Sequence, residues 1–532
     1  MHTPHRPSAR NRIIIGLATV ALLAAACGKT NSTSSSSGST STTNRDTLTV
    51  AIGFSEEIDP DVYFDLESTT ITSALYEGLV RYKPGTPDIE GVLAEKWEIS
   101  PDGLTFTFHL RSGATFADGS AIDSKAVRAA FQRKTDVAGP PSYILKGISG
   151  YDTPDASTFV IKLEQPINNF LYRLASPWGS LITNPAVIAA NEKDGDHAKG
   201  WLGSHSAGSG QYVVKDFVPD DRIVLEANSK YWGTKPTFKQ VVFKIVPDTS
   251  SQQLQTEQGD VDIMAGVGPD TGAQIEAQGK VNLEAVQGYG QMFYQVNVTK
   301  APFTDPAIGR ALEQSIPYAS IAKTVLGKYG RTPDQLAPPG VMPAGRAAFQ
   351  PKLDAAAFKQ ATASVDKSTP ITIGQLTPDP ANIFARTNEF VAEVLRSAGF
   401  TVQIVPVVGA DYFGLIAAPD KAPTLMLTNQ PGDGTQPANW FDLFYRSDGA
   451  LNVGGVGNAE IDQLLDAGNA VPSGQKPDYD KYEQAAEAML ATGGIIPVAD
   501  LKQLFVSGTS ITGLKMHLVS APAFWISEIK KG

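Results

Sequence analysis

LAEKWEISPDGLTFTFHLRSGATFADG, residues 93–119, alternates apolar and polar side chains in two arms around a Pro101-Asp102-Gly103 turn. A period of two is typical of a strand with one buried face, so the segment predicts a β-hairpin. A second turn at Asp118-Gly119 precedes IDSKAVRAAFQR, residues 122–133, where Asp123 or Ser124 is expected to cap a helix. The alternating apolar residues of the hairpin are Trp97, Ile99, Leu104, Phe106, Phe108 and Leu110.

The hairpin follows LYEGLVRY, residues 75–82. In this order the three phrases resemble the signature of the extracytoplasmic solute-binding proteins of family 5, the peptide/nickel class of receptors that feed ABC importers. The resemblance implies an α/β, two-lobed periplasmic-binding-protein-like fold of type II, with an extra subdomain, around an interlobe cleft with a hinge. It also implies a binding protein rather than an enzyme, with no cofactor.

Three further segments, residues 208–262, 292–326 and 371–498, match the same family in the same order. Their apolar periodicity predicts strands and helices in alternation. The expected strands are 223–225, 241–246, 260–263, 371–376, 401–407 and 424–427, and the expected helices are 249–258, 383–398, 459–467 and 479–490.

The family's architecture, carried over to this chain, divides it into lobes that are interrupted in sequence. Lobe I is expected to take residues 46–84, 206–295 and 505–532, with an inserted subdomain at 85–205. Lobe II is expected to take residues 296–504. The crossings near Tyr294–Asn297 and Ala499–Leu504 are expected to act as the hinge.

The N-terminus indicates export. A basic stretch is followed by an apolar run, Ile13 to Ala26, which is too short for a comfortable membrane span. The run ends at Cys27, the only cysteine, so residues 1–26 resemble a bacterial lipoprotein signal peptide with Cys27 as the lipidated residue. Residues 27–45 are rich in Ser and Thr and predict a tether. We expect a lipid-anchored protein on the extracytoplasmic face of the bacterial cell membrane; an ordinary secretory signal is the alternative.

The composition limits the partners. A net charge of −11 without a basic stripe argues against nucleic acid, and a single cysteine excludes an internal disulfide. The expected partners are an oligopeptide or similar small solute, an ABC permease, and membrane lipid through Cys27. The protein is expected to be a monomer.

The segment LTNQPGDGTQPANWFDLFY, residues 427–445, contains the principal candidate for ligand recognition. In peptide-binding members an aspartate four residues before a Pro-x-Asn phrase pairs with the peptide's α-ammonium, and Asp433 stands in that place before Pro437-Ala438-Asn439. A charge-assisted bond of this kind contributes about 1.5–3 kcal/mol. The alternative is that Asp433 only stabilises the Gly432-Asp433-Gly434 turn.

Other binding residues follow from the same resemblance. The backbone of Asn429, Gln430 and Pro431 is expected to lie along an extended ligand as an added strand, although Pro431 has no N–H to donate. Trp440 and Tyr294 are candidate apolar walls, and a place in the core is the alternative for both. The facing segment of lobe I is expected to be Phe64, Asp65 and Leu66.

One departure from the family pattern bears on the solute. Dipeptide-specific members carry an arginine before the helix of lobe II that clamps the ligand carboxylate, whereas this chain has Leu376-Thr377-Pro378-Asp379 there and Arg386 inside the helix. A longer or blocked peptide therefore fits better than a short one. A non-peptide solute (an oligosaccharide, a metal chelate or haem) and a sensor or adhesin that kept the fold are alternatives.

Other chemistries find little support. The six histidines show no metal-ligand spacing, so no metal site is expected. The sequence Ser204-His205-Ser206-Ala207-Gly208 lacks the first glycine of a nucleophile elbow, which leaves a secreted hydrolase using Ser206 as a remote alternative.

Overall fold

A computed structural model describes residues 46–53, 55, 57–377, 379, 381–520 and 523–532. The predicted signal peptide, Cys27 and the predicted tether lie outside these residues. Residues 45–532 form one compact unit. Among the described residues, no helix combines the length and the apolar character needed to cross a membrane.

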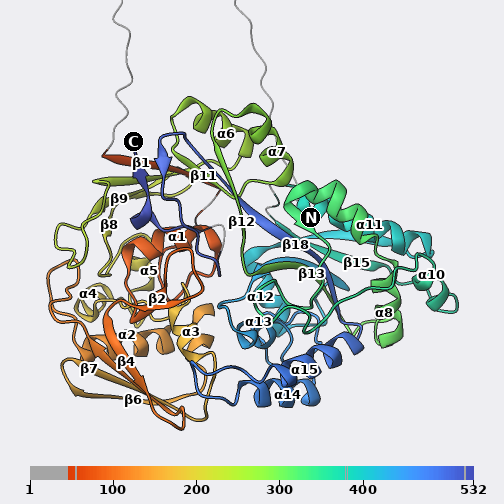
Figure 1. The fold of residues 1–532 in the computed structure, drawn as a ribbon, viewed down its shortest axis with the longest axis horizontal. Helices are drawn as coiled ribbons and strands as arrows, with labels where there is room; N and C mark the ends of the chain where they lie inside the picture. The colour runs from red at the N-terminus through yellow and green to blue at the C-terminus, as the bar shows by residue number, and fades with distance from the viewer. Residues whose placement is uncertain (1–45, 54, 56, 378, 380, 521–522) are drawn as a thin grey trace, which may run out of the picture. The chain divides into compact units, whose positions relative to one another are not determined.

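A single twelve-stranded sheet runs through this unit, in the order β16-β15-β17-β13-β18-β11-β1-β10-β9-β8, with β12 and β14 also paired to β18 (Figure 1). Its strands are β1 (Thr47–Ile52), β8 (Tyr212–Val218), β9 (Arg222–Ala227), β10 (Gln240–Ile245), β11 (Ile263–Ala265), β12 (Asn282–Gln287), β13 (Gly290–Val296), β14 (Gly330–Arg331), β15 (Ile371–Thr377), β16 (Val402–Val408), β17 (Leu425–Pro431) and β18 (Ile495–Ser507).

Strand β18 joins the two halves of this sheet. Its first residues pair antiparallel with β13, up to the pair Met292↔Ala499. Its last residues pair with β12 from Gln287↔Lys502 onward and with β11. The other passage between the halves lies at Gly288–Tyr289, between β12 and β13, because β13 is paired with β17 along its whole length. The family resemblance predicted this crossing near Tyr294–Asn297, but residues 294–296 lie inside β13 and Asn297 follows its end. An architecture carried over by approximate position does not locate the residue at which this chain passes between the halves.

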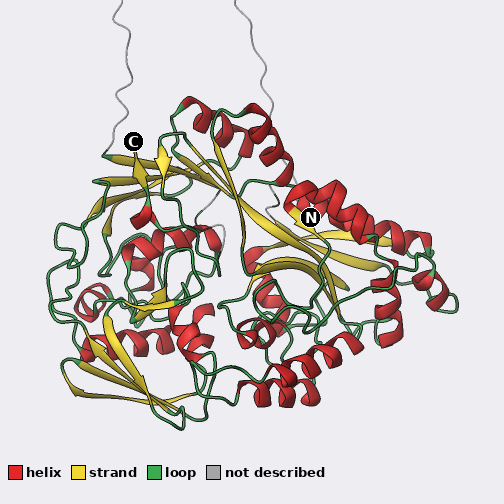
Figure 2. Ribbon diagram, in the orientation of Figure 1, coloured by secondary structure: helices red, strands yellow, loops and turns green. Residues whose placement is uncertain are grey.

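Helices cover the two halves (Figure 2). In the first half α1 (Leu66–Leu75) packs with β1, β9 and β10 over one apolar cluster that includes Leu48, Ile71 and Phe243. The remaining helices of this half are α6 (Thr249–Gln258) and α7 (Pro269–Gln278), and the first of these ends at Gly259, where φ is 81°.

The second half buries both faces of its strands. Along β13, Met292, Tyr294 and Val296 belong to one apolar cluster and Phe293 to another, as expected when alternate side chains point to opposite faces. The helices of this half are α8 (Pro306–Ser315), α9 (Tyr318–Ile321), α10 (Ala357–Ala361), α11 (Ile383–Ser397), α12 (Gly409–Ala417), α13 (Pro437–Phe444), α14 (Ala459–Asn469) and α15 (Tyr479–Ala491).

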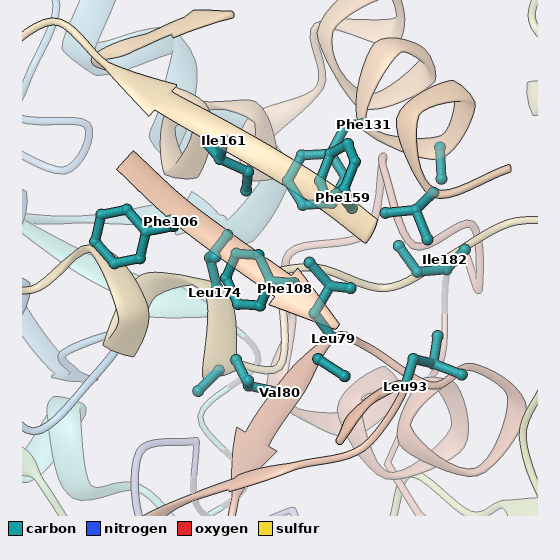
Figure 3. Close-up of a cluster of buried hydrophobic side chains, with 14 of the residues drawn as sticks. Leu79, Val80, Leu93, Phe106, Phe108, Phe131, Phe159, Ile161, Leu174 and Ile182 are labelled. Atoms are coloured by element: carbon teal, nitrogen blue, oxygen red, sulfur yellow. The ribbon is translucent and has the colours of Figure 1, made fainter. Parts of the chain in front are cut away.

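Residues 94–163 contain a separate four-stranded sheet, in the order β4-β5-β7-β6. The predicted hairpin is confirmed as β4 (Ala94–Ile99) and β5 (Thr105–Leu110), with Trp97 opposite Phe108. Figure 3 shows Phe106, Phe108, Phe159 and Ile161 gathered in its core. The other two strands of this sheet are β6 (Ile148–Asp155) and β7 (Thr158–Leu163). The helices of this part of the chain, up to residue 202, are α2 (Ser124–Val137), α3 (Phe170–Ala175), α4 (Pro185–Asn191) and α5 (Lys199–Leu202).

Most of the predicted elements are confirmed within one or two residues at their ends. Helix α2 is capped by Asp123, whose carboxylate accepts a hydrogen bond from the Ala126 N–H. Strand β11 is shorter than predicted and begins at Ile263, because the N–H groups of Asp260 and Val261 bond to the Gln255 carbonyl instead of to a strand. Two short hairpins, β2 (Val80–Tyr82) with β3 (Ile89–Gly91) and β19 (Ile511–Thr512) with β20 (Lys530–Lys531), complete the strands.

A buried ionic cluster fixes α2 to the chain that leads to α1. The Arg133 guanidinium contacts Asp59 Oδ2 at 2.6 Å and Asp61 Oδ2 at 2.5 Å, and Lys134 Nζ lies 2.9 Å from Asp61 Oδ1. All four side chains are buried. Charges removed from water require this degree of pairing, so loss of one member leaves an uncompensated buried charge. The cluster positions the segment that ends at Phe64.

We predict that Arg133→Ala lowers the free energy of unfolding by about 3–5 kcal/mol, because Asp59 and Asp61 lose their principal partner. Urea unfolding followed by circular dichroism measures the change. Arg128→Ala, on the exposed face of the same helix, is the matched control and should shift stability by less than about 0.5 kcal/mol. Equal midpoints for the two variants would contradict the structural role of the cluster.

Candidate functional site

A cavity of about 190 Å³ lies between two groups of residues that are far apart in sequence. One wall comes from residues 143–173, around α3, and the other from residues 433–469, around α13 and α14. Concave sites lined by segments from different parts of a fold are the usual places where small ligands bind.

Five side chains in the lining carry buried polar atoms that have no hydrogen-bond partner among the described residues. Buried polar groups are nearly always paired, and an unpaired one costs about 1–3 kcal/mol. Their gathering around one cavity makes it the candidate site for a polar solute. They are Tyr143 (OH), Asn169 (Oδ1 and Nδ2), Asp433 (Oδ2), Asn439 (Oδ1) and Asp442 (Oδ1).

Asp433 lies in the loop between β17 and α13 and is only 4% exposed. Burial raises the pKa of its carboxyl well above the ordinary value. The loop is held in place on both sides: the Gly432 N–H donates to the Tyr289 carbonyl at 3.2 Å, and the Thr435 N–H donates to the Tyr82 hydroxyl at 3.1 Å. The carboxyl is thus fixed without being paired.

Asn439 and Asp442 project from α13, one helical turn apart. The Asn439 amide packs against Gly434, where a Cβ would lie within 2.5 Å of it, so only glycine at 434 leaves room for this side chain. Asp442 Oδ2 lies 3.3 Å from Arg173 Nη2 of α3, across the cavity. Burial raises the pKa of Asp442 to about 6, against the opposing effects of Arg173 and Arg446.

Aromatic residues lie behind the opposite wall. The Phe64 ring is 6.0 Å from that of Tyr143, edge to face, and 4.8 Å from that of Trp178. Phe64 and Tyr143 each pack against both the core of the four-stranded sheet and the core around Trp440. These contacts place the predicted facing segment beside the cavity wall.

Comparison with known proteins identifies the family. The model of the bacterial extracellular solute-binding proteins, family 5, matches residues 88–452. The chain belongs to this family. The probable D,D-dipeptide-binding periplasmic protein DdpA of Escherichia coli (strain K12) is 27% identical over 485 residues, which cover 90% of this chain and 92% of the relative.

Proteins of known structure show the same two-lobed fold. The periplasmic binding protein DppA of Helicobacter pylori, in complex with the peptide STSA, superposes with a TM-score of 0.81 at 20% identity, over 91% of this chain and 98% of that one. NikA of Brucella suis, in complex with Fe(III)-EDTA, gives 0.77 at 18% identity, over 91% and 100%. The predicted family and fold class are confirmed.

The predicted binding residues of this family 5 protein occupy different surroundings. Asp433 lines the cavity. Asp65 caps α1, since its carboxylate accepts a hydrogen bond from the Ser68 N–H at 2.6 Å. Tyr294 and Trp440 are fully buried in the core, where the Tyr294 hydroxyl donates to Asn388 Oδ1 at 2.7 Å. Neither aromatic residue lines the cavity, so neither belongs to the site proposed below.

The backbone of Asn429, Gln430 and Pro431 forms the end of β17 and pairs with β13. On the other edge of β17, the pairing with β15 reaches only Leu427. Residues 428–431 therefore have no strand partner on that edge among the described strands, which is the arrangement that an added strand requires. The side chains of Gln430 and Leu66 lie outside the described part of the structure.

Residues considered for other chemistries are engaged elsewhere. Arg386 pairs with Asp270 at 2.6 Å and also donates to the Thr324 carbonyl, away from the cavity. The Ser206 hydroxyl accepts a hydrogen bond from the Val214 N–H, and the His205 ring stacks on Trp201. Within the described ranges, no group of three or more His, Cys, Asp or Glu side chains is arranged to hold a metal.

The sequence interpretation did not include Tyr143, Asn169 and Asp442. Asp442 follows Asn439 by three residues, and the helical pattern of 437–444 contains enough information to place both on one face. Tyr143 and Asn169 carry no comparable signal, because a segment nearly 300 residues away in the chain completes the cavity.

We predict that Asp433→Asn stabilises the solute-free protein at pH 7.5, by about 1–3 kcal/mol, since a buried carboxyl without a partner resists ionisation whereas the unfolded chain ionises it freely. The raised pKa means that this carboxyl favours the folded state most below about pH 4, and that its contribution is lost as the pH rises. The difference between variant and wild type should therefore shrink toward pH 4.5 in urea unfolding. Asp420→Asn, at an exposed position, is the control; a less stable Asp433→Asn would contradict the prediction.

Proposed function

We propose that this protein is the lipid-anchored substrate-binding protein of an ABC importer, and that it captures oligopeptide-like solutes in the cavity around Asp433. The proposal is supported mainly by a set of buried, unpartnered polar atoms on residues that line one cavity: Tyr143, Asn169, Asp433, Asn439 and Asp442. The relative named as D,D-dipeptide-binding and the structural neighbour in complex with the peptide STSA support a peptide solute. Family membership supports binding rather than catalysis.

In this proposal Asp433 receives the peptide's α-ammonium. A cation beside a desolvated carboxyl favours its ionised form, so binding and loss of the Asp433 proton are coupled. The unpaired edge at residues 428–431 offers backbone groups to an extended peptide. Recognition of the backbone and the amino terminus suits solutes of mixed sequence.

Capture is proposed to use hinge closure between the lobes. Two connections join the halves of the sheet: strand β18 and the Gly288–Tyr289 link between β12 and β13. Hinge motion occurs where few residues connect two lobes. Closure removes water from the cavity, which strengthens each polar contact to the solute. The solute-bound form then meets the permease.

We predict that trialanine binds the wild-type protein and that N-acetyl-trialanine binds at least about tenfold more weakly, because acetylation removes the charge that Asp433 recognises. Asp433→Ala should weaken trialanine binding to a similar extent and leave little difference between the two peptides. Isothermal titration calorimetry measures both, with Asp420→Asn as a control that keeps the wild-type discrimination.

The natural solute gives a separate test of the peptide assignment. Mass spectrometry of small molecules released by denaturing the purified protein should show peptides of mixed sequence. A single non-peptide species, such as an oligosaccharide or a metal chelate, would overturn the assignment and leave the family fold unaffected.

We predict that Cys27→Ser moves the protein from the membrane fraction to the soluble extracytoplasmic fraction, since two acyl chains on one cysteine are what stable anchoring requires. Fractionation with immunoblotting and incorporation of labelled fatty acid measure the change. A variant that stays in the membrane fraction and still incorporates fatty acid would contradict lipidation at Cys27.

A further inference from the structure

The unpartnered atoms around the cavity are mostly hydrogen-bond acceptors. Asp433 Oδ2, Asn439 Oδ1, Asp442 Oδ1 and Asn169 Oδ1 are oxygens, whereas Asn169 Nδ2 is the one buried nitrogen in the set. Asp433, Asn439 and Asn169 are each more than nine-tenths buried. A single α-ammonium carries three N–H donors, fewer than these four oxygens, so a solute with further donors would satisfy more of the lining.

The cations of the lining are already committed. Lys146 pairs with Asp448, and Arg446 lies 2.9 Å from Asp448 and 2.6 Å from Asp466. Arg173 is paired with Asp442. A negatively charged group of a solute would therefore have to break an existing ion pair, whereas a positively charged group meets carboxylate oxygens that have no partner.

The acceptors of Asp433, Asn439 and Asp442 lie in sequence along the Asp433 loop and one face of α13. The Asp433 loop packs on α13 through the contact of Gly434 with Asn439, and Asp442 stands one turn further along the same face, where Cβ atoms are about 5–6 Å apart. Asp442 uses one oxygen for Arg173 and presents the other without a partner. The series of acceptors leads from the proposed ammonium position toward a second carboxylate.

We propose that the cavity selects solutes with a second cationic N–H group beside the α-ammonium, as in peptides whose first residue is lysine or arginine. Asp433 faces the ammonium, and Asp442 with Asn439 faces the side-chain cation. The inference rests on the proposed function, because it specifies which peptides the same cavity takes. Asn169 and Tyr143, on the opposite wall, lie on the other side of the peptide's first residue.

Three peptides separate the two proposals: Lys-Ala-Ala, norleucyl-Ala-Ala, in which a methyl group replaces the lysine ammonium, and N-acetyl-norleucyl-Ala-Ala. Calorimetric titration of the full-length protein at pH 7.5 should show Lys-Ala-Ala binding about tenfold more tightly than norleucyl-Ala-Ala. Asp442→Asn should reduce this ratio to near one. Asp420→Asn, at an exposed position that is not part of the cavity lining, should keep the wild-type ratio.

The outcomes distinguish the proposed function from the second cation subsite. If norleucyl-Ala-Ala binds better than its acetylated form but lysine adds no affinity, the second cation subsite is overturned and the proposed function stands. If acetylation makes no difference, or none of the peptides binds, both are overturned. A lysine preference that persists in Asp442→Asn overturns the assignment to Asp442.

Discussion

The structure depends on β18, a strand hydrogen-bonded in both halves of the sheet. It pairs with β13 at one end and with β11 and β12 at the other, so the two lobes share one continuous layer. This continuity fixes β13, and β13 in turn fixes the register of β17, since the two strands pair from Gly290↔Pro431 to Val296↔Leu425. The loop that carries Asp433 leaves β17 immediately after this ladder. The position of the Asp433 loop is thus set by backbone hydrogen bonds, which substitutions other than those to proline leave in place.

The buried carboxyl of Asp433 at the cavity differs from the buried carboxylates that form ion pairs elsewhere in the described residues. Elsewhere, buried charges are paired closely, as in the cluster of Asp59, Asp61, Arg133 and Lys134. At the cavity, Asp433 is equally buried, its Oδ2 has no partner among the described residues, and burial raises the pKa of its carboxyl well above the ordinary value. A fold that has the means to pair buried charges leaves this one unpaired. Such local sacrifice of stability is expected where binding, rather than packing, determines the residue.

Much of the fold follows from local patterns because those patterns act over short distances. The hairpin of β4 and β5, the Asp123 cap of α2 and the end of α6 at Gly259 each depend on residues within one turn or one strand. The sequence could single out Asp433 for the same reason, because Asp433 and the Pro437-Ala438-Asn439 phrase lie in one short segment. Asn169 faces the same cavity from the inserted segment, and nothing near it in the sequence distinguishes it from neighbouring Asn168, which bonds to the Pro472 and Gln475 carbonyls. Which of two adjacent asparagines lines the cavity is a property of tertiary packing alone.

The cavity lining offers unpartnered carboxylate oxygens, whereas its cations are already in ion pairs. Arg386, in the helix that follows the position where a carboxylate clamp was expected, is held by Asp270, and the cations of the lining are held by Asp442, Asp448 and Asp466. For the proposed peptide solute, the described lining therefore offers unpartnered acceptors at the amino end and no uncommitted cation at the carboxyl end. Under the proposed function, affinity is concentrated on the first residue. The remainder of the peptide contributes through backbone pairing at residues 428–431, which is insensitive to its sequence.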